Sequence, residues 1–315
     1  MNQDELRSIV EAEIRRALGE TASPEAAPAA GASPAPPAAA TRSRPRPAVA
    51  RWLRDEEPAP EPSPSPAPQA APAQPSRAPA IESPANPAAL ARFVASTPSK
   101  IGIGRAGTRY PTRVYLGLRA DHAVAKDAVY SESQESFALG LGCLPLKTRC
   151  KDKQEYLLYP AQGRRLDEES QAKLEREASR GVDVQLIVGD GLSAWAAERN
   201  CPELLPLMQQ ELGRAGYTVG RPLFVRFARV GVQDQIGVLT GARATVIMLG
   251  ERPGLGTGDS LSVYVAFGPR LDQDNAEKNC ISNVRALGIL PAEAARETAE
   301  ILRRAFAAGR GGVSK

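Results

Sequence analysis

The chain has 315 residues, 28 of them proline, and its 40 basic and 36 acidic residues give a formal net charge of +4. The two signs are interleaved along the globular part, which argues against the basic patch of a nucleic-acid-binding protein. The sequence also lacks the ~20 consecutive apolar residues of a membrane-spanning helix, and its first residues lack the basic and apolar regions of a signal peptide, so we expect a soluble, cytoplasmic protein.

Residues 1–19 have the apolar spacing of an amphipathic helix. Leu6, Ile9 and Ile14 belong to a series that recurs every three or four residues, and Gly19 ends it. An isolated helix of this length is close to the ~12 to 15 residues below which helices are marginal in water. We expect it to fold when it binds another protein, with docking on its own domain as the alternative.

Residues 20–85 consist mainly of proline, alanine and serine, and they contain most of the prolines of the chain. Such a segment cannot bury enough apolar surface to offset the entropy lost on ordering. We therefore predict a disordered linker. A flexible coil of this length has a root-mean-square span of ~45 Å, so the first helix could act at a distance from a folded domain over residues 86–315.

Within residues 86–315, helix and strand patterns alternate. Helices are predicted at 113–130, 166–179, 193–200, 203–214, 235–239 and 291–309, and strands at 182–188, 223–230, 244–249 and 261–267. This alternation predicts an α/β fold in which helices flank a mostly parallel, Rossmann-like sheet. Ligands of such sheets bind beyond the carboxyl ends of the strands, which here carry residues 190–193, 228–230 and 250–254.

Residues 102–107 spell the pattern G-x-G-x-x-G of dinucleotide-binding proteins. That pattern needs a buried strand before it and a helix that opens at its third glycine. Here Pro98 precedes the glycines, and Pro111 interrupts the segment after them. A structural glycine turn is the preferred interpretation, and a dinucleotide site is the alternative.

Metal-binding and nucleophilic patterns are weak. The one histidine, His122, has no cysteine or histidine companion at a ligand spacing. The four cysteines, Cys143, Cys150, Cys201 and Cys280, contain no C-x-x-C pair, and reduced thiols are expected. We predict neither a metal ligand nor a catalytic residue in this chain.

The loop at 250–260 follows the most apolar predicted strand and is rich in glycine, which lets a backbone approach a ligand closely. Glu251 would offer acceptors to the amide N–H groups of a large polar cofactor. The loop lacks the Lys-Ser/Thr ending of a phosphate-binding loop, so nucleotide hydrolysis is not indicated. A ligand-binding loop and a plain surface loop both remain open on these residues alone.

Several short segments taken together resemble the small subunit of ethanolamine ammonia-lyase, an adenosylcobalamin-dependent enzyme. They occur in order at 104–107, 121–122, 126–127, 163–166, 183–185, 190–193, 234–237, 250–255 and 280–283. The Gly-Glu-Arg-Pro-Gly-Leu and Cys-Ile-Ser-Asn segments are the most specific of these.

The resemblance implies a two-chain enzyme. In that family the large subunit is a barrel that binds the substrate, and the small subunit helps to enclose the cobalamin. The positions that match the family's cobalamin contacts are Val230, Glu251 and Cys280. The implied reaction converts ethanolamine into acetaldehyde and ammonia by a radical mechanism, and the cofactor carries that chemistry. The chain alone is not expected to be active.

The resemblance also extends to the N-terminal helix, which in this family is associated with packing the enzyme into a bacterial microcompartment. It implies that shell or cargo proteins bind residues 1–20 and that the enzyme lies within a microcompartment in the cytoplasm. Two other functions stay open on the residues alone: a nucleotide-binding α/β oxidoreductase, and a scaffold protein without catalysis.

Overall fold

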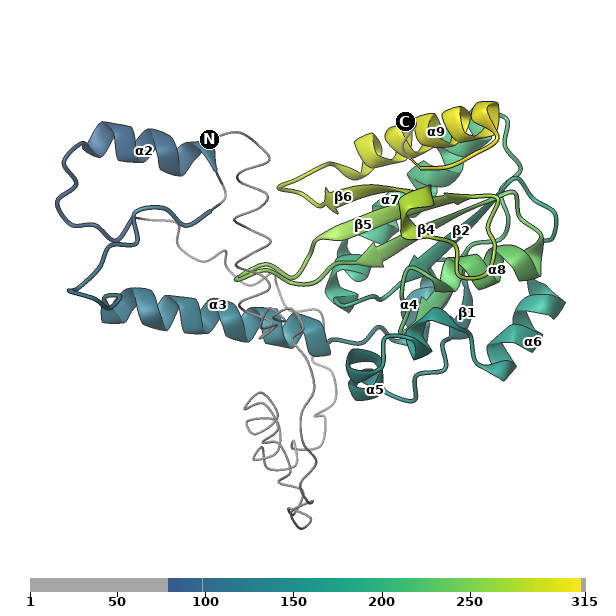
Figure 1. The fold of residues 1–315 in the computed structure, drawn as a ribbon, viewed down its shortest axis with the longest axis horizontal. Coiled ribbons are helices and arrows are strands. Elements are labelled where there is room, and N and C mark those ends of the chain that lie inside the picture. The colour runs from purple at the N-terminus through teal and green to yellow at the C-terminus, as the bar shows by residue number, and fades with distance from the viewer. Residues whose placement is uncertain (1–78, 98, 313–315) are drawn as a thin grey trace, which may run out of the picture. The chain divides into compact units, whose positions relative to one another are not determined.

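The computed structural model describes residues 79–97 and 99–312 (Figure 1). The helix predicted over residues 1–19 and residues 20–78 of the predicted linker lie outside the described residues. Residues 79–85, the remainder of that linker, contain neither helix nor strand. The first described helix, α2 (Pro87–Ser96), begins after Asn86, whose side chain accepts a hydrogen bond from the amide of Ala89 at 2.9 Å.

The described residues form one six-stranded sheet in the order β1-β3-β2-β4-β5-β6. The strands are β1 (Leu144–Lys147), β2 (Val184–Gly189), β3 (Leu223–Arg226), β4 (Ala244–Gly250), β5 (Leu261–Phe267) and β6 (Lys278–Val284). Four of them, β1, β3, β2 and β4, pair in parallel. The other two pairings, β4 with β5 and β5 with β6, are antiparallel.

The α/β class is confirmed, but the expectation of a mostly parallel sheet is wrong, because the sheet is mixed. The connections responsible are the loop 251–260, between β4 and β5, and residues 268–277, between β5 and β6, neither of which contains an α-helix. A parallel pair requires a long crossover, whereas a direct return gives an antiparallel neighbour. The carboxyl ends of β4 and β6 and the start of β5 therefore lie at one edge of the sheet.

Helices cover both faces of the sheet (Figure 1). On one face, α7 (Ala194–Arg214) packs on β2 and β4, and α9 (Pro291–Ala308) packs beside it on β5 and β6. Leu186 and Met208 belong to the apolar cluster of this face. On the other face, Ile187 and Ile236 belong to a second cluster, to which α6 (Glu168–Glu177) and α8 (Val232–Thr240) contribute. Because both faces are covered, β2 and β4 are buried along their whole length.

The remaining described helices precede β2. They are α3 (Thr112–Tyr130), α4 (Glu135–Gly140) and α5 (Lys153–Leu158), with short 3-10 turns at η2 (Gln162–Arg164) and, before β6, η3 (Asn275–Glu277). Unlike α7, α2 has no buried residue, and α3 buries only Asp121 and Ala128. These two helices therefore contribute little to the core.

Two predicted helices, 193–200 and 203–214, are in fact the single helix α7. Pro202 and Pro206 lie inside it, and proline in a helix interior removes a backbone hydrogen bond. The apolar stripe through Ala197, Cys201 and Leu205 continues past both prolines into the core. Burial of that stripe outweighs the local preference for a break.

The strand predicted at 223–230 ends earlier, at Arg226, because Phe227 has a positive φ of 59°. Val230 therefore lies in the turn that opens α8 and not at the end of a strand.

The sequence patterns also missed β1 and β6. β1 is a short edge strand, and β6 contains a register shift against β5 that breaks the alternation of buried and exposed residues.

Candidate functional site

A cavity of about 470 Å³ opens at the edge of the sheet where β4 and β6 end. The predicted site residues Val230, Glu251 and Cys280 all line it, although they come from the turn before α8, the loop after β4, and β6. The complete lining consists of Tyr156, Leu192, Arg229, Val230, Leu249, Gly250, Glu251, Arg252, Ser262, Tyr264, Cys280 and Ser282. The structure thus brings the three together, and their role in cofactor binding stays a prediction.

Asp190, directly after β2, fixes the turn that carries Val230. Its Oδ1 atom accepts a hydrogen bond from the amide of Ala228 at 3.1 Å, and its side chain is fully buried. Burial raises the pKa of this carboxyl, against the attraction of Lys153 and the backbone amides around it. The Lys153 ammonium, itself buried, donates to the Gly191 carbonyl at 3.2 Å. These two buried polar groups are thus tied to backbone atoms of the loops that carry the lining residues Leu192 and Arg229.

The left-handed residue Phe227 is held by its neighbours in space. Its carbonyl accepts a hydrogen bond from Thr148 Oγ1 at 3.0 Å, and its ring stacks on Tyr156 at 6.0 Å between centroids. The Tyr156 hydroxyl donates to the carbonyl of Ala228 at 3.0 Å. A strained backbone persists only when the surroundings determine it, and here they direct residues 228–230 toward the cavity.

Arg229 forms part of the same wall. Its Nη2 atom donates to the Tyr156 carbonyl at 2.8 Å, and its guanidinium carbon lies 4.1 Å from the centre of the Tyr156 ring. Its Nε atom is buried and has no hydrogen-bond partner among the described residues. The protein therefore fixes the guanidinium on one side without satisfying all of its donors.

Glu251 holds the ends of β5 and β6 together. Its Oε2 atom accepts from the Ser260 hydroxyl at 2.6 Å, and its Oε1 atom accepts from the Ser262 hydroxyl at 2.5 Å and from the Asn283 amide at 2.9 Å. Burial would raise the pKa of this carboxyl, but these donors and the charge of Arg285 outweigh it and hold the pKa below its usual range. Glu251 is therefore an ionised hydrogen-bond acceptor, and donors of the protein itself already use most of its capacity to accept hydrogen bonds.

The contact with Asn283 explains the irregularity in β6. Val263 pairs with Ile281 and Leu261 with Val284, so that Ser282 and Asn283 together oppose the single residue Ser262. Asn283 has a positive φ of 62°. An extra residue in a strand leaves a backbone group without a ladder partner, and here the carboxylate of Glu251 receives that N–H.

Cys280 and Tyr264 are paired across β5 and β6. Cys280 is exposed as a residue, but partial enclosure of its thiol by the protein is the main cause that raises the thiol pKa, and the charge of Glu251 adds to it. Burial likewise raises the pKa of the Tyr264 phenol. Both groups are therefore protonated at neutral pH, and a protonated thiol is a weak nucleophile. This pair can offer hydrogen-bond donors and contact area to a ligand.

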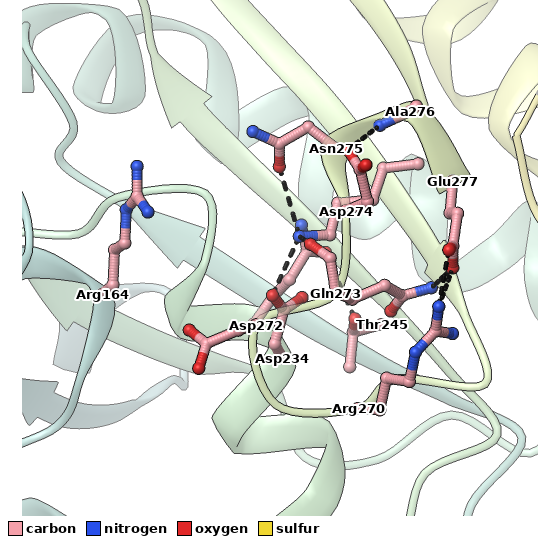
Figure 2. Close-up of polar contacts among 12 residues, drawn as sticks. Arg164, Asp234, Thr245, Arg270, Asp272, Gln273, Asp274, Asn275, Ala276 and Glu277 are labelled. Atoms are coloured by element: carbon pink, nitrogen blue, oxygen red, sulfur yellow. Dashed lines mark hydrogen bonds and ion pairs between the residues drawn. The ribbon is translucent and has the colours of Figure 1, made fainter.

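A buried ion pair anchors the start of β6. Lys278 Nζ donates to Asp234 Oδ2 at 2.9 Å, to the Gln273 carbonyl at 3.0 Å and to Asn275 Oδ1 at 3.3 Å. Figure 2 shows how Asp234 approaches from α8 while Gln273 and Asn275 approach from the connection between β5 and β6. This contact therefore joins α8, which begins two residues after Val230, to β6, which carries Cys280.

Sequence reasoning assigned the strand ends 190–193, 228–230 and 250–254 to the ligand crevice, and these ranges contain half of the lining: Leu192, Arg229, Val230, Gly250, Glu251 and Arg252. Arg229 and Arg252 are the immediate neighbours of Val230 and Glu251, and their position beside strand ends was the available signal. Tyr156 reaches the cavity from α5, which the patterns did not predict, and Tyr264 reaches it from β5, whose pairing with β6 was not predicted either. No sequence pattern would have selected these two tyrosines.

The other candidate motifs lie elsewhere. Gly102, Gly104 and Gly107 have positive φ angles, and the described residues before them form no strand. The pattern at 102–107 is therefore a structural turn. His122 is exposed on α3, and the described residues contain no cluster of His, Cys, Asp or Glu side chains that could hold a metal ion. Within the same residues, no helix is long and apolar enough to cross a membrane.

The chain is similar to a family of known proteins. The model of the family "Ethanolamine ammonia-lyase light chain (EutC)" matches residues 87–315. A protein of Clostridium perfringens named ethanolamine ammonia-lyase small subunit is 40% identical over 223 residues, which cover 71% of this chain and 76% of that protein. Proteins of the same name are 40% identical in Fusobacterium nucleatum, covering 68% of this chain and 72% of the relative, and 37% identical in Listeria monocytogenes, covering 70% and 76%.

Proposed function

The chain belongs to the ethanolamine ammonia-lyase light-chain family, and we propose that its cavity at the sheet edge binds adenosylcobalamin against the large subunit of that enzyme. One observation carries this proposal. Val230, Glu251 and Cys280, chosen by resemblance to the family's cobalamin contacts, lie in three separate parts of the fold and line the same cavity.

The side chains of the cavity fit such a cofactor. The rim of a corrin carries amide groups that both donate and accept hydrogen bonds. Glu251 supplies an ionised acceptor, and Tyr264, Cys280 and Ser282 supply donors or mixed groups. When bound, adenosylcobalamin supplies the radical chemistry that converts ethanolamine into acetaldehyde and ammonia.

The contribution of this chain is binding, orientation and exclusion of water. The thiol and phenol at the cavity are protonated, and Glu251 is occupied by protein donors. We therefore place no proton transfer on this subunit, and we expect it to be inactive without the large subunit.

The surface near the cavity suits a protein partner. Leu158, Tyr159 and Leu255 are each more than half exposed. They lie at the end of α5 and in the loop after β4, close in sequence to the lining residues Tyr156 and Arg252. Exposed apolar side chains gathered near one site are typical of a subunit interface, and the large subunit is the proposed partner.

Residues 1–19 are proposed to direct the enzyme into a bacterial microcompartment. The proposal rests on the apolar stripe of this segment and on the linker that follows it. Residues 1–20 fused to a fluorescent protein should form foci in cells that build such compartments, and diffuse fluorescence would contradict the proposal.

The cofactor proposal is tested by copurification. The chain and the large subunit are coexpressed and loaded with adenosylcobalamin, and retained corrinoid is measured by absorbance. We expect retention by the wild type, reduced retention by Glu251→Ala and Cys280→Ala, and unchanged retention by Glu293→Ala, whose side chain is exposed on α9. Normal retention by both site variants would show that the site is wrongly assigned.

A further inference from the structure

Two arginines line the cavity, and within the part of the chain that the structure describes neither has an acidic partner. Among the described residues, neither Arg229 nor Arg252 has a carboxylate oxygen within the 4.0 Å of an ion pair. The acidic side chain of the lining, Glu251, already receives three hydrogen bonds from the protein. The wall therefore presents an excess of positive charge, and such a surface attracts an anionic group.

The guanidinium of Arg229 is fixed in place before any ligand arrives. The Tyr156 ring supports one face of it, and the Tyr156 carbonyl accepts from Nη2. The backbone of Arg229 is also held, because its amide donates to the Gly163 carbonyl at 2.8 Å. A group oriented in this way loses little conformational entropy on binding.

Arg252 approaches the cavity from a different loop. It follows Glu251 after β4, its side chain is exposed, and the described residues provide it with no hydrogen-bond partner. Arg229 lies after β3, and β2 separates β3 from β4 in the sheet. One rigid and one adaptable guanidinium thus face the same cavity from either side of β2.

We propose that Arg229 and Arg252 form an anion-binding subsite for the phosphodiester in the nucleotide tail of adenosylcobalamin. This inference rests on the proposed function. Guanidinium groups donate paired N–H bonds that match the oxygens of a phosphate. The corrin rim carries neutral amides, so the phosphodiester is the group of the cofactor that this charge selects. The subsite thereby orients the cofactor, with its tail toward the loops after β3 and β4.

The experiment compares two corrinoids that differ in this group. The complex with the large subunit is titrated by equilibrium dialysis with adenosylcobalamin and with adenosylcobinamide, which lacks the nucleotide tail and its phosphodiester. Loss of a charge-assisted hydrogen bond costs roughly 1.5 to 3 kcal/mol, so Arg252→Gln should weaken adenosylcobalamin binding about 10-fold to 100-fold. Its affinity for adenosylcobinamide should equal that of the wild type, and Arg252→Lys should recover part of the loss.

Two further variants complete the design. Arg310→Gln is the matched control, because Arg310 is also exposed but lines a different cavity beside α9, and it should change neither affinity. Arg229→Gln should show the same selectivity as Arg252→Gln. Because Arg229 also contacts Tyr156, the thermal unfolding of Arg229→Gln is measured in parallel. If Arg229→Gln is unfolded, the proposal is judged from the variants of the exposed Arg252 alone.

The outcomes separate the proposals. If Arg252→Gln loses the same affinity for both corrinoids, or loses no affinity for adenosylcobalamin, the phosphodiester subsite is overturned while the proposed function stays intact. Dissociation of the two subunits by Arg252→Gln would assign the arginine to a carboxylate of the large subunit and would also overturn it. A wild-type complex that retains neither corrinoid would refute the proposed function itself.

Discussion

Gly191 and Gly250 meet backbone to backbone at the carboxyl ends of β2 and β4. A Cβ atom on Gly191 would lie 2.3 Å from the Gly250 carbonyl oxygen, and one on Gly250 would lie 2.0 Å from the carbonyl oxygen of Ser193. The same Gly250 carbonyl accepts the amide of Leu192 at 3.0 Å. This contact sets the separation of the two loops and with it the position of Glu251, the next residue.

The first prediction concerns this contact. Gly250→Ala should destabilise the protein by about 3 kcal/mol or more, because the added methyl group meets backbone atoms that cannot move independently. It should also reduce corrinoid retention, since Glu251 is displaced. Chemical unfolding measures the first effect and absorbance of the purified complex the second.

Gly213→Ala is the control for Gly250→Ala. Gly213 lies exposed in α7, and its added Cβ would meet nothing within 4 Å. Alanine is a better helix former than glycine by up to about 1 kcal/mol, so this variant should be slightly more stable than the wild type. A stable Gly250→Ala variant with normal retention would show that the loop adapts.

A second prediction follows from the lowered pKa of Glu251. The pKa of this carboxyl is lower in the folded state than in the unfolded chain, where it is about 4.3. Such a group stabilises the folded protein fully when the pH is above the pKa of the unfolded chain. The stabilisation is lost as the pH falls through the folded-state pKa. The free energy of unfolding of the wild type should therefore exceed that of Glu251→Gln by a constant amount above about pH 5.

Below about pH 4 this difference should shrink. Denaturant titrations of both proteins between these pH values measure it. Ser262→Ala removes one donor to Oε1. The difference in unfolding free energy between Ser262→Ala and the double variant Ser262→Ala, Glu251→Gln should therefore be smaller than the difference between the wild type and Glu251→Gln. A difference that stays constant into the acid range would contradict the proposed role of the three hydrogen bonds.

The parts of the fold that could be predicted from sequence are those whose residues are buried continuously. β2, β4 and β5 are apolar runs covered on both faces, and β5 was predicted with the bounds that the structure shows. The direction of β5 was not predictable from that run, because an apolar strand has the same pattern in parallel and antiparallel sheets. Its direction follows from the loop before it.

The candidate site was partly predictable for the same reason. Glu251 follows a buried strand, so the rule for strand ends placed it at the edge of the sheet where the cavity opens. Cys280 lies on β6, where the bulge at Ser282 and Asn283 removes the period of two, and only resemblance selected it. The capture of a strand amide by Glu251 depends on residues that are distant in sequence, and no local pattern encodes it.

A third prediction concerns the buried pair of Lys278 and Asp234, both of whose side chains are 2% exposed. Lys278→Met should cost about 3 to 5 kcal/mol, because it leaves a carboxylate buried without its partner. The double variant Lys278→Met, Asp234→Leu should recover much of this loss, since it removes both charges. Urea unfolding of the wild type and the variants measures these differences.

Arg214→Met provides the comparison. Arg214 pairs with Glu211 on the exposed surface of α7, and loss of such a pair should change the free energy of unfolding by no more than about 1 kcal/mol. If the double variant is as unstable as Lys278→Met alone, the lysine stabilises β6 through Gln273 and Asn275 more than through the carboxylate.

The last prediction uses Cys280 as a probe of the cavity. Cys280 is exposed, whereas Cys143, Cys150 and Cys201 are buried, and burial raises the pKa of Cys143 to about 12. In the native chain, iodoacetamide should therefore modify Cys280 alone, as read by peptide mass spectrometry, while all four react in denaturant. The reaction should be slow at neutral pH and faster with rising pH, because the thiolate is the reactive form.

Two comparisons extend this test. Cys280 in Glu251→Gln should react faster than in the wild type, since the charge of Glu251 adds to the raised pKa of Cys280. In the complex with the large subunit, bound adenosylcobalamin should protect Cys280 from modification. Equal labelling of the free and loaded complexes would place Cys280 outside the cofactor site.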